Sequence, residues 1–184
     1  MRLPALAALL ILAIQVAPLA AHAQAPNRAT QPAAPQPARL GEFQSWTAAA
    51  HTENGQKLCY AFTRARSTDG VPGRDANNVL LLVTHRSISR DQVAVRVGYS
   101  FARNAESKLF VGQGEMPFFT AGDTAFAREG RAVVTALRGG REALHRGPGP
   151  NGRGQAADTF ALAGFVQAYE AINRECPPAA APRR

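Results

Sequence analysis

The sequence is poor in the residues that usually mark a catalytic or metal site. Among 184 residues it has only two cysteines, one tryptophan and four histidines. His51, His85 and His145 have neither the i, i+4 spacing of a helical metal pair nor the clustering of a zinc site. It also lacks a G-x-S-x-G elbow or a comparable nucleophile motif. The sequence therefore predicts no metal, no cofactor and no enzymatic activity.

Only one apolar run approaches the length of a membrane span, and it lies at the N-terminus. Arg2 precedes an uncharged stretch from Leu3 to Ala21 that leads into the small-residue triplet A-H-A. This layout is typical of a secretory signal peptide over residues 1–23, cleaved between Ala23 and Gln24. An uncleaved anchor is the alternative, because the run approaches the ~20 residues needed to cross a bilayer. No integral membrane span is expected after cleavage.

Composition divides the rest of the chain into three parts. Residues 24–40 carry four prolines among alanines and glutamines, and such a segment buries too little apolar surface to offset its ordering entropy. We expect a disordered linker there and a short disordered basic tail at 179–184. Residues 41–178 are enough for one globular domain with its own core.

Acidic residues are scarce, with 13 Asp and Glu against 21 Lys and Arg, and the formal net charge is +8. A basic exported domain could hold anionic lipid, polysaccharide or nucleic acid. The arginines are scattered from Arg64 to Arg174, however, which favours a solvated surface. The Gly- and Arg-rich segment 138–154 has no aromatic side chain for base stacking. We therefore expect no nucleic-acid partner.

Short apolar segments joined by turns dominate the domain. Two strands flank the turn at Asn54 and Gly55, a strong hairpin signal, and residues 67–78 have the composition of a loop. Further strands are expected at 79–86, 92–102, 108–120 (two) and 142–146, and a helix within 124–140. These elements predict a mainly β fold, an antiparallel β-sandwich-like domain with about two flanking α-helices, one of them C-terminal.

Ten aromatic side chains occur at strand or helix spacing and are expected in the core rather than in a ligand cage. They are Phe43, Trp46, Phe62, Phe101, Phe110, Phe118, Phe119, Phe126, Phe160 and Phe165. Residues 147–152 formally match the G-x-G-x-x-G nucleotide motif. Pro148 and Pro150 lack the N–H groups that a phosphate needs, so this segment is expected to be a loop between strands.

The final segment, residues 159–176, changes from strand to helix at Gly164. Beyond it, Phe165, Tyr169, Ile172 and Cys176 recur at helical spacing, which places the sulfur on the buried face. An even number of cysteines in an oxidising compartment indicates a disulfide, here between Cys59 and Cys176. Two buried free thiols, or a reactive nucleophile, are the alternatives.

Several of these segments together resemble the invasion-associated locus B family of bacterial exported proteins. They are F-Q-S-W-T with Trp46, the strand around Cys59, the strand V-L-L-L-V-T-H-R, and the ending T-F-A-L-A-G-F-V-Q-A-Y-E-A-I, in which Leu162, Gly164 and Phe165 occupy the family's Leu-x-Gly-Phe turn. The resemblance implies a compact β-sandwich-like domain with flanking helices, in the periplasm or at the cell surface, with no established enzymatic activity.

The chain also departs from that family's pattern. Ala50 stands where the family often has a cysteine, and a mid-domain cysteine pair is absent. The resemblance therefore leaves only the pairing of Cys59 with Cys176, and it does not carry over the family's role in host-cell invasion.

The main functional prediction is a non-enzymatic binding or envelope-associated module, with an envelope or host-surface component as the candidate partner. One alternative is a basic binder of acidic envelope polymers. The other is a periplasmic hydrolase, whose site would assemble from His85 and distant serines or carboxylates.

Overall fold

The computed structural model describes residues 36–178. The expected signal peptide with its cleavage site between Ala23 and Gln24, most of the expected linker, and the expected tail lie outside the described residues. Within the described range, none of the helices combines the length and the apolar character needed to cross a bilayer.

The domain consists of one sheet, two α-helices and two short 3₁₀ turns. The strands are β1 (Ala38–Phe43), β2 (Trp46–Glu53), β3 (Gln56–Arg64), β4 (Ser67–Asp69), β5 (Leu80–Arg86), β6 (Gln92–Arg96), β7 (Glu106–Val111), β8 (Gly114–Ala121), β9 (Thr124–Ala127), β10 (Glu142–Pro148) and β11 (Gln155–Ala161). The helices are α1 (Gly130–Gly139) and α2 (Phe165–Glu175), and the turns are η1 (Ala76–Asn78) and η2 (Pro150–Gly152).

The strand order is β1-β2-β3-β5-β6-β9-β8-β7-β10-β11-β4, and each strand pairs antiparallel with its neighbours. β3 and β4 are two halves of one bent strand. At the bend, the Ala65 N–H donates to the Val79 carbonyl at 2.9 Å, and the Arg66 N–H donates to the Thr159 carbonyl at 2.7 Å. The strand thus pairs first with β5 and then with β11, which links β4, at one end of the strand order, to β3, the third strand from the other end. The prediction of a mainly antiparallel, sandwich-like β domain with two helices is confirmed.

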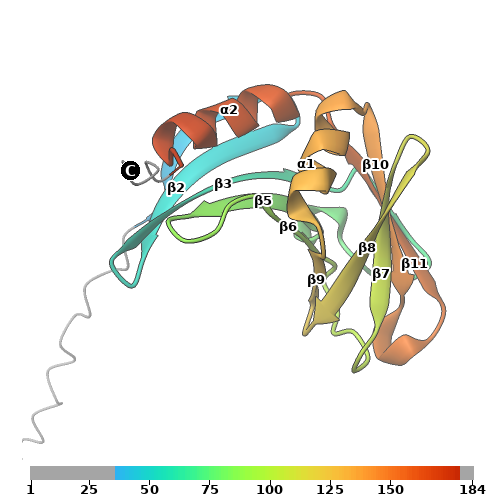
Figure 1. Cartoon of the computed structure of the whole chain (residues 1–184). Coiled ribbons are helices and arrows are strands. Elements are labelled where there is room, and N and C mark those ends of the chain that lie inside the picture. The colour runs from blue at the N-terminus through green and yellow to red at the C-terminus, as the bar shows by residue number, and fades with distance from the viewer. Residues whose placement is uncertain (1–35, 179–184) are drawn as a thin grey trace, which may run out of the picture. The chain divides into compact units, whose positions relative to one another are not determined.

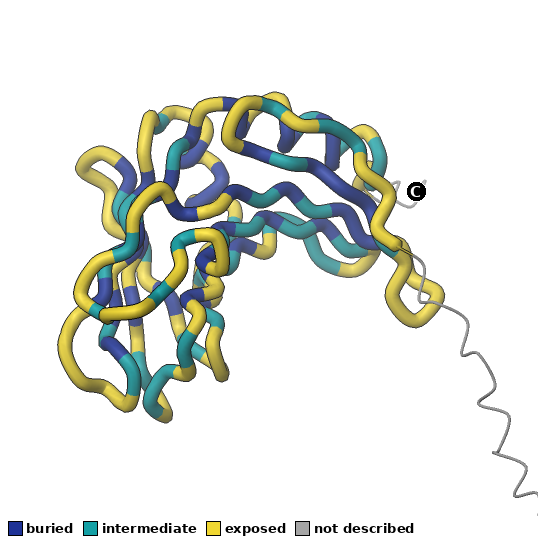
Figure 2. The backbone as a smooth tube through the Cα atoms, turned by 180° about the vertical axis from the view of Figure 1, so that it is seen from behind, coloured by how far each residue is buried: buried dark blue, intermediate teal, exposed yellow. Residues whose placement is uncertain are grey.

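The core lies on one face of this curved sheet. Along the strands, buried and more exposed residues alternate with period two, as in β6, where Val93 and Val95 are at most 2% exposed and Gln92 and Arg96 are exposed. Figure 1 shows α2 lying over β2 and β3, with α1 beside it toward β8 and β10. Figure 2 shows the same alternation of burial along the strands from behind. The two helices therefore cover the inward face and leave the outward face of these strands uncovered by helix.

One predicted element begins at the wrong residue. The helix expected within 124–140 starts only at Gly130, and residues 124–127 form β9 between β6 and β8. Phe126 lies seven residues before Val133, which is two helical turns, so the spacing fits a helix by coincidence. In the sheet Phe126 points outward and is 36% exposed, whereas its neighbour Ala125 is fully buried.

The prediction that all ten aromatic side chains are core was wrong for four of them, Phe62, Phe110, Phe119 and Phe126, which lie on the outward face of their strands. Phe119 is 43% exposed and Phe126 is 36% exposed, and the two rings stack with centroids 5.5 Å apart. Trp46, Phe118, Phe160 and Phe165 are fully buried, and Phe43, Phe62, Phe101 and Phe110 are partly buried. Position along a strand does not reveal which face is covered, which is why the pattern alone misplaced these four rings.

Smaller differences concern the edges of elements. β1 begins at Ala38, so the last three residues expected in the linker are strand instead. Residues 67–69, expected to be loop, form β4 because they continue β3 onto β11. β10 extends to Pro148, and the remaining residues of the G-x-G-x-x-G segment connect it to β11.

Gly164 joins β11 to α2 and has no room for a side chain. Its φ is +92°, and a Cβ there would lie 1.8 Å from the Phe43 carbonyl oxygen. We expect Gly164→Ala to lower the free energy of unfolding by about 2–5 kcal/mol, from backbone strain and overpacking together. Gly55→Ala is the matched control, since Gly55 also has a positive φ, +76°, but nothing within 4 Å, and its expected cost is about 1–2 kcal/mol. Equal losses in urea titrations would contradict the steric argument.

Candidate functional site

The four residues that carry the family resemblance meet where β11 turns into α2. The Trp46 and Phe165 rings are both fully buried with centroids 4.8 Å apart. The Trp46 indole N–H donates to the Ala161 carbonyl at 3.0 Å, and Leu162 is buried beside this junction. These side chains seat the C-terminal helix on β2, so their role in this protein is structural.

A disulfide joins Cys59 of β3 to Cys176, which ends α2, across 117 residues of sequence. The two Cα atoms are 6.0 Å apart and Cys59 is fully buried. This confirms the predicted bond over both alternatives, because the described range contains no free cysteine. The C-terminal helix is therefore tied covalently to the first hairpin.

His85, around which a hydrolase site was considered, lies fully buried under α2. Its Nδ1 accepts the Asp91 backbone N–H at 3.2 Å, so the ring proton is assigned to Nε2, which faces the Asn173 Oδ1 at 3.1 Å. Asp91 Oδ1 is 3.9 Å from Nδ1, and neither ring nitrogen is hydrogen-bonded to a serine within residues 36–178. The predicted assembly of His85 with a serine is thus not formed, and both ring nitrogens are engaged.

The polar groups around His85 hold the end of α2 to the β5–β6 connection. Arg90 donates to the Cys176 carbonyl and to Asn173 Oδ1, each at 2.5 Å. The Tyr169 hydroxyl donates to Asp91 Oδ1 at 2.7 Å. Burial raises the pKa of Tyr169 to about 12, and the hydrogen bond to Asp91 acts in the same direction. Burial lowers the pKa of His85, and the charge of Arg90 lowers it further. Asp91 and the hydrogen bond to Asn173 act in the opposite direction but do not outweigh these effects.

This lowered pKa makes the stability of the domain depend on pH. The unfolded chain binds a proton at His85 near the ordinary value of about 6.5, whereas the folded protein binds it only at lower pH. The free energy of unfolding should therefore fall as the pH drops below about 6.5, down to the folded-state pKa. Urea unfolding at a series of pH values measures this slope. His85→Gln should reduce the slope, and an unchanged slope in this variant would contradict the assignment.

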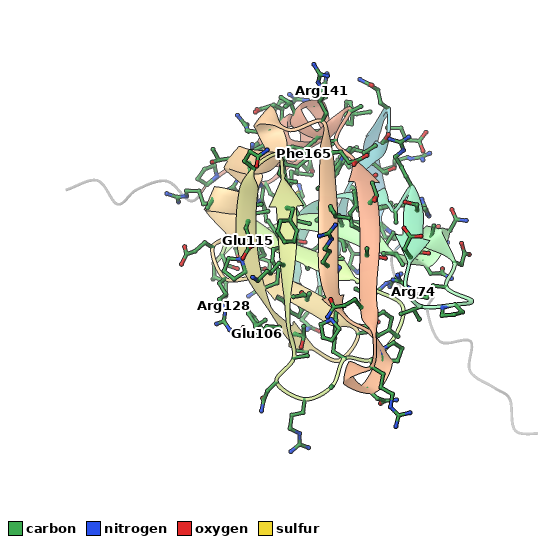
Figure 3. All side chains as sticks on the ribbon, turned by 90° about the vertical axis from the view of Figure 1, so that its right-hand side faces the viewer. Arg74, Glu106, Glu115, Arg128, Arg141 and Phe165 are labelled. Atoms are coloured by element: carbon green, nitrogen blue, oxygen red, sulfur yellow. A yellow bond between two sulfur atoms is a disulfide. The ribbon has the colours of Figure 1, made fainter. Side chains whose placement is uncertain are left out.

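A second buried polar cluster lies between loop 70–78 and strands β10 and β11. Arg74 Nη1 is 2.7 Å from Asp158 Oδ1, and His145 Nδ1 is 3.3 Å from Asp158 Oδ2. The three side chains are 5%, 0% and 0% exposed. The Arg74 guanidinium also lies over the Tyr99 ring, 5.4 Å from its centroid. Figure 3 places Arg74 at the edge of β11, so this ion pair fastens the loop to the sheet.

Tyr99 completes this cluster. Its hydroxyl donates to the Pro148 carbonyl at 2.9 Å, and burial raises the pKa of Tyr99 to about 12. The ring stays neutral at ordinary pH and packs against Phe101 with centroids 5.3 Å apart.

A serine also borders this cluster, so the fold brings a serine, a histidine and an aspartate to one place. Ser107 and His145 both adjoin Gly147, where a Cβ would lie 2.8 Å from Ser107 Cβ and 3.7 Å from His145 Cε1. Neither Ser107 Oγ nor His145 Nε2 has a hydrogen-bond partner within the described chain. Ser107 is 3% exposed and His145 is 0% exposed, so no substrate reaches them in this conformation.

The sequence did not indicate this trio, because its members stand on three strands. The only feature that could have indicated the trio is that all three side chains face inward, from β7, β10 and β11. That feature brings them together only once the pairing of these strands is known. Within residues 36–178, no three His, Cys, Asp or Glu side chains gather as a metal site would require. The largest of the main surface cavities, about 500 Å³, is shallow and lined by Phe110, Leu144, Arg141, Glu142 and the glycines beside them.

These features define a class of protein, a small antiparallel β domain that is closed by one disulfide and covered by a C-terminal helix. No family model and no curated protein matches the sequence. Among solved structures, the crystal structure of invasion associated protein B from Bartonella henselae is similar, with a TM-score of 0.52 and 16% sequence identity. The match covers 73% of this chain and 95% of that one. It shows a shared fold and supports the resemblance stated above at the level of structure.

Proposed function

We propose that this protein is an exported, non-enzymatic binding module of the bacterial envelope, located in the periplasm or at the cell surface. The observation that carries the proposal is the likeness of fold to invasion associated protein B. The disulfide between Cys59 and Cys176 supports it, because such bonds persist in oxidising compartments outside the cytosol. The signal-like N-terminus supports export independently of the fold.

Expression of the full chain in a Gram-negative host tests the export half of this proposal. Fractionation should recover the protein outside the cytoplasm, N-terminal sequencing should begin at Gln24, and thiol counting should find no free thiol. Cytoplasmic protein with two free thiols would overturn it. The binding half is tested by mild crosslinking in the native envelope, followed by purification. Turnover on a panel of ester, peptide and glycan substrates that one substitution abolishes would overturn the non-enzymatic part.

A second candidate function, electrostatic capture of acidic envelope polymers, is favoured by the distribution of arginines. Arg64, Arg96, Arg141 and Arg146 are exposed, and none has a carboxylate within 4.0 Å in the described chain. This function predicts binding to an acidic polysaccharide such as alginate that weakens steeply as salt increases.

A further inference from the structure

A row of five apolar side chains crosses five adjacent strands on the outward face of the sheet. The row consists of Phe62 in β3, Leu82 in β5, Ala94 in β6, Phe126 in β9 and Phe119 in β8, each directly opposite the next in the strand pairing. Directly opposed residues in antiparallel strands share a face. The row is therefore continuous, and we call it the outer row.

The outer row lies opposite the hydrophobic core. The residues beside it in the same strands, Leu81, Val95 and Phe118, are fully buried, whereas the outer row is partly buried or exposed. Its five members span four strand spacings, about 19 Å at about 4.8 Å each. Both helices pack on the other face (Figure 1). None of its side chains lines a main surface cavity of the described chain, so it forms an open face rather than a small-molecule pocket.

Arginines border the outer row on the same face. Arg64 and Arg96 lie on either side of Leu80 in the strand pairing, and neither has a carboxylate within 4.0 Å among residues 36–178. The Arg64 guanidinium lies 5.7 Å from the Phe62 centroid. These two cations and the apolar row form one amphipathic surface with unneutralised positive charge.

At the far end of the row, the Arg128 guanidinium lies near the Phe119 ring, as that of Arg64 lies near Phe62. Its guanidinium is 5.9 Å from the Phe119 centroid and 2.6 Å from Glu106 Oε1. Figure 3 shows Arg128 and Glu106 close together at this end of the sheet. Arg128 is therefore already paired, and the free positive charge lies with Arg64 and Arg96.

The chemistry of this face restricts its partner. A second copy would bring four guanidinium groups, from Arg64 and Arg96 of each copy, to one apolar interface without carboxylates among residues 36–178 to neutralise them, and unneutralised like charge disfavours association. A planar ligand that binds by stacking, such as a nucleobase, would have to displace groups that already engage the ring faces, since Phe119 stacks on Phe126 and Arg64 lies over Phe62. The ring edges and methyl groups remain free for apolar contact. An anionic bilayer supplies acyl chains for these groups and phosphates for the guanidinium groups.

We propose that the outer row, with Arg64 and Arg96, docks this protein on a bilayer that contains anionic phospholipid. The inference rests on the proposed envelope location, and it assigns the surface and the partner. The exposed edges of Phe119 and Phe126 contact the boundary between headgroups and acyl chains. Arg64 and Arg96 bind lipid phosphates, so binding is electrostatic as well as apolar.

Vesicle co-sedimentation of the mature, oxidised protein tests this. Vesicles made of equal parts phosphatidylglycerol and phosphatidylcholine should bind the protein, vesicles of phosphatidylcholine alone should not, and added salt should weaken binding. Phe119→Ser with Phe126→Ser, and separately Arg64→Gln with Arg96→Gln, should each weaken binding about tenfold or more, since each removes two contacts of about 1 kcal/mol. Far-UV circular dichroism checks that the variants fold.

Arg131→Gln with Arg174→Gln is the matched control, because it removes the same charge from exposed sites on the two helices, which cover the other face of the sheet. It should change binding by no more than about twofold, consistent with the short range of surface electrostatics. An equal loss in this control would overturn the assignment in favour of diffuse attraction.

Absence of vesicle binding overturns the inference, and so does binding to soluble alginate or to oligothymidylate without vesicle binding. If a variant misfolds, hydrogen exchange on the wild type replaces it as the test. Vesicles should then protect the backbone amides of the outer row from exchange, and a lack of protection would overturn the inference. None of these outcomes depends on the export assay, which tests the proposed function separately.

Discussion

Removing the disulfide by Cys59→Ser with Cys176→Ser is expected to lower the free energy of unfolding by about 4–5 kcal/mol, the upper end for a closed loop of this length. The bond spans 117 residues, so it restricts nearly all of the unfolded domain. Its loss also releases the end of α2, whose other polar contacts at this end include those of Arg90 with Asn173 and the Cys176 carbonyl, and the ion pair of Glu175 with Lys57. Denaturant titration of the oxidised wild type and the double variant measures the difference.

The wild type under reducing conditions is the control for this experiment. Reduction should lower its stability to about that of the double variant, while the variant should not respond to the reductant. If reduction leaves the wild type unchanged, or if the double variant is as stable as the oxidised protein, the stabilising role of the bond is wrong.

Asp158→Ala is expected to be nearly as damaging, at about 3–5 kcal/mol, because it leaves the Arg74 guanidinium buried without its anion. Arg74 is 5% exposed and its Nη1 lies 2.7 Å from Asp158 Oδ1. Glu115→Ala breaks an ion pair of nearly the same length, 2.6 Å to Lys108, in which both side chains are about half exposed, and it should cost at most about 1 kcal/mol. Thermal and urea unfolding of both variants make the comparison.

A double replacement separates the buried charge from the lost packing. Arg74→Met with Asp158→Leu removes both ions together, and buried pairs replaced in this way often cost little. We expect it to be more stable than Asp158→Ala alone. If the double variant is the less stable of the two, the loss of stability in Asp158→Ala does not come mainly from the unpaired charge of Arg74, and the expectation is wrong.

The sequence predicted the local part of the fold because local signals determine it. The turn at Asn54 and Gly55, the alternation through Val93 and Val95, and the helical spacing from Phe165 to Cys176 each depend on neighbours within one element. The same reasoning could not assign Phe126, whose place in β9 is decided by its two partner strands. It also could not find β4, which exists only because β11 lies beside it.

The same limit applies to the candidate sites. Cys59 and Cys176 could be paired because only one pairing exists. In the cluster of Arg74, His145 and Asp158, the last two face each other across the β10–β11 hairpin, but Arg74 comes from a loop far earlier in the sequence, and no spacing rule connects it to them. The outer row was also hidden, since it is defined by register across five strands and since its three rings, Phe62, Phe119 and Phe126, look like core residues in the sequence.

The bent strand formed by β3 and β4 has a consequence for how the chain folds. Its first half, β3, pairs with β5, which follows closely in the sequence. Its second half, β4, pairs only with β11, which lies near the end of the domain. Such distant pairings slow folding, because the entropy cost of closing a long loop comes before any stabilising contact between its ends has formed. During synthesis from the N-terminus, the domain remains incomplete until its last strand and helix emerge. Folding should therefore be late and cooperative, and the early strands should stay exposed to chaperones until then.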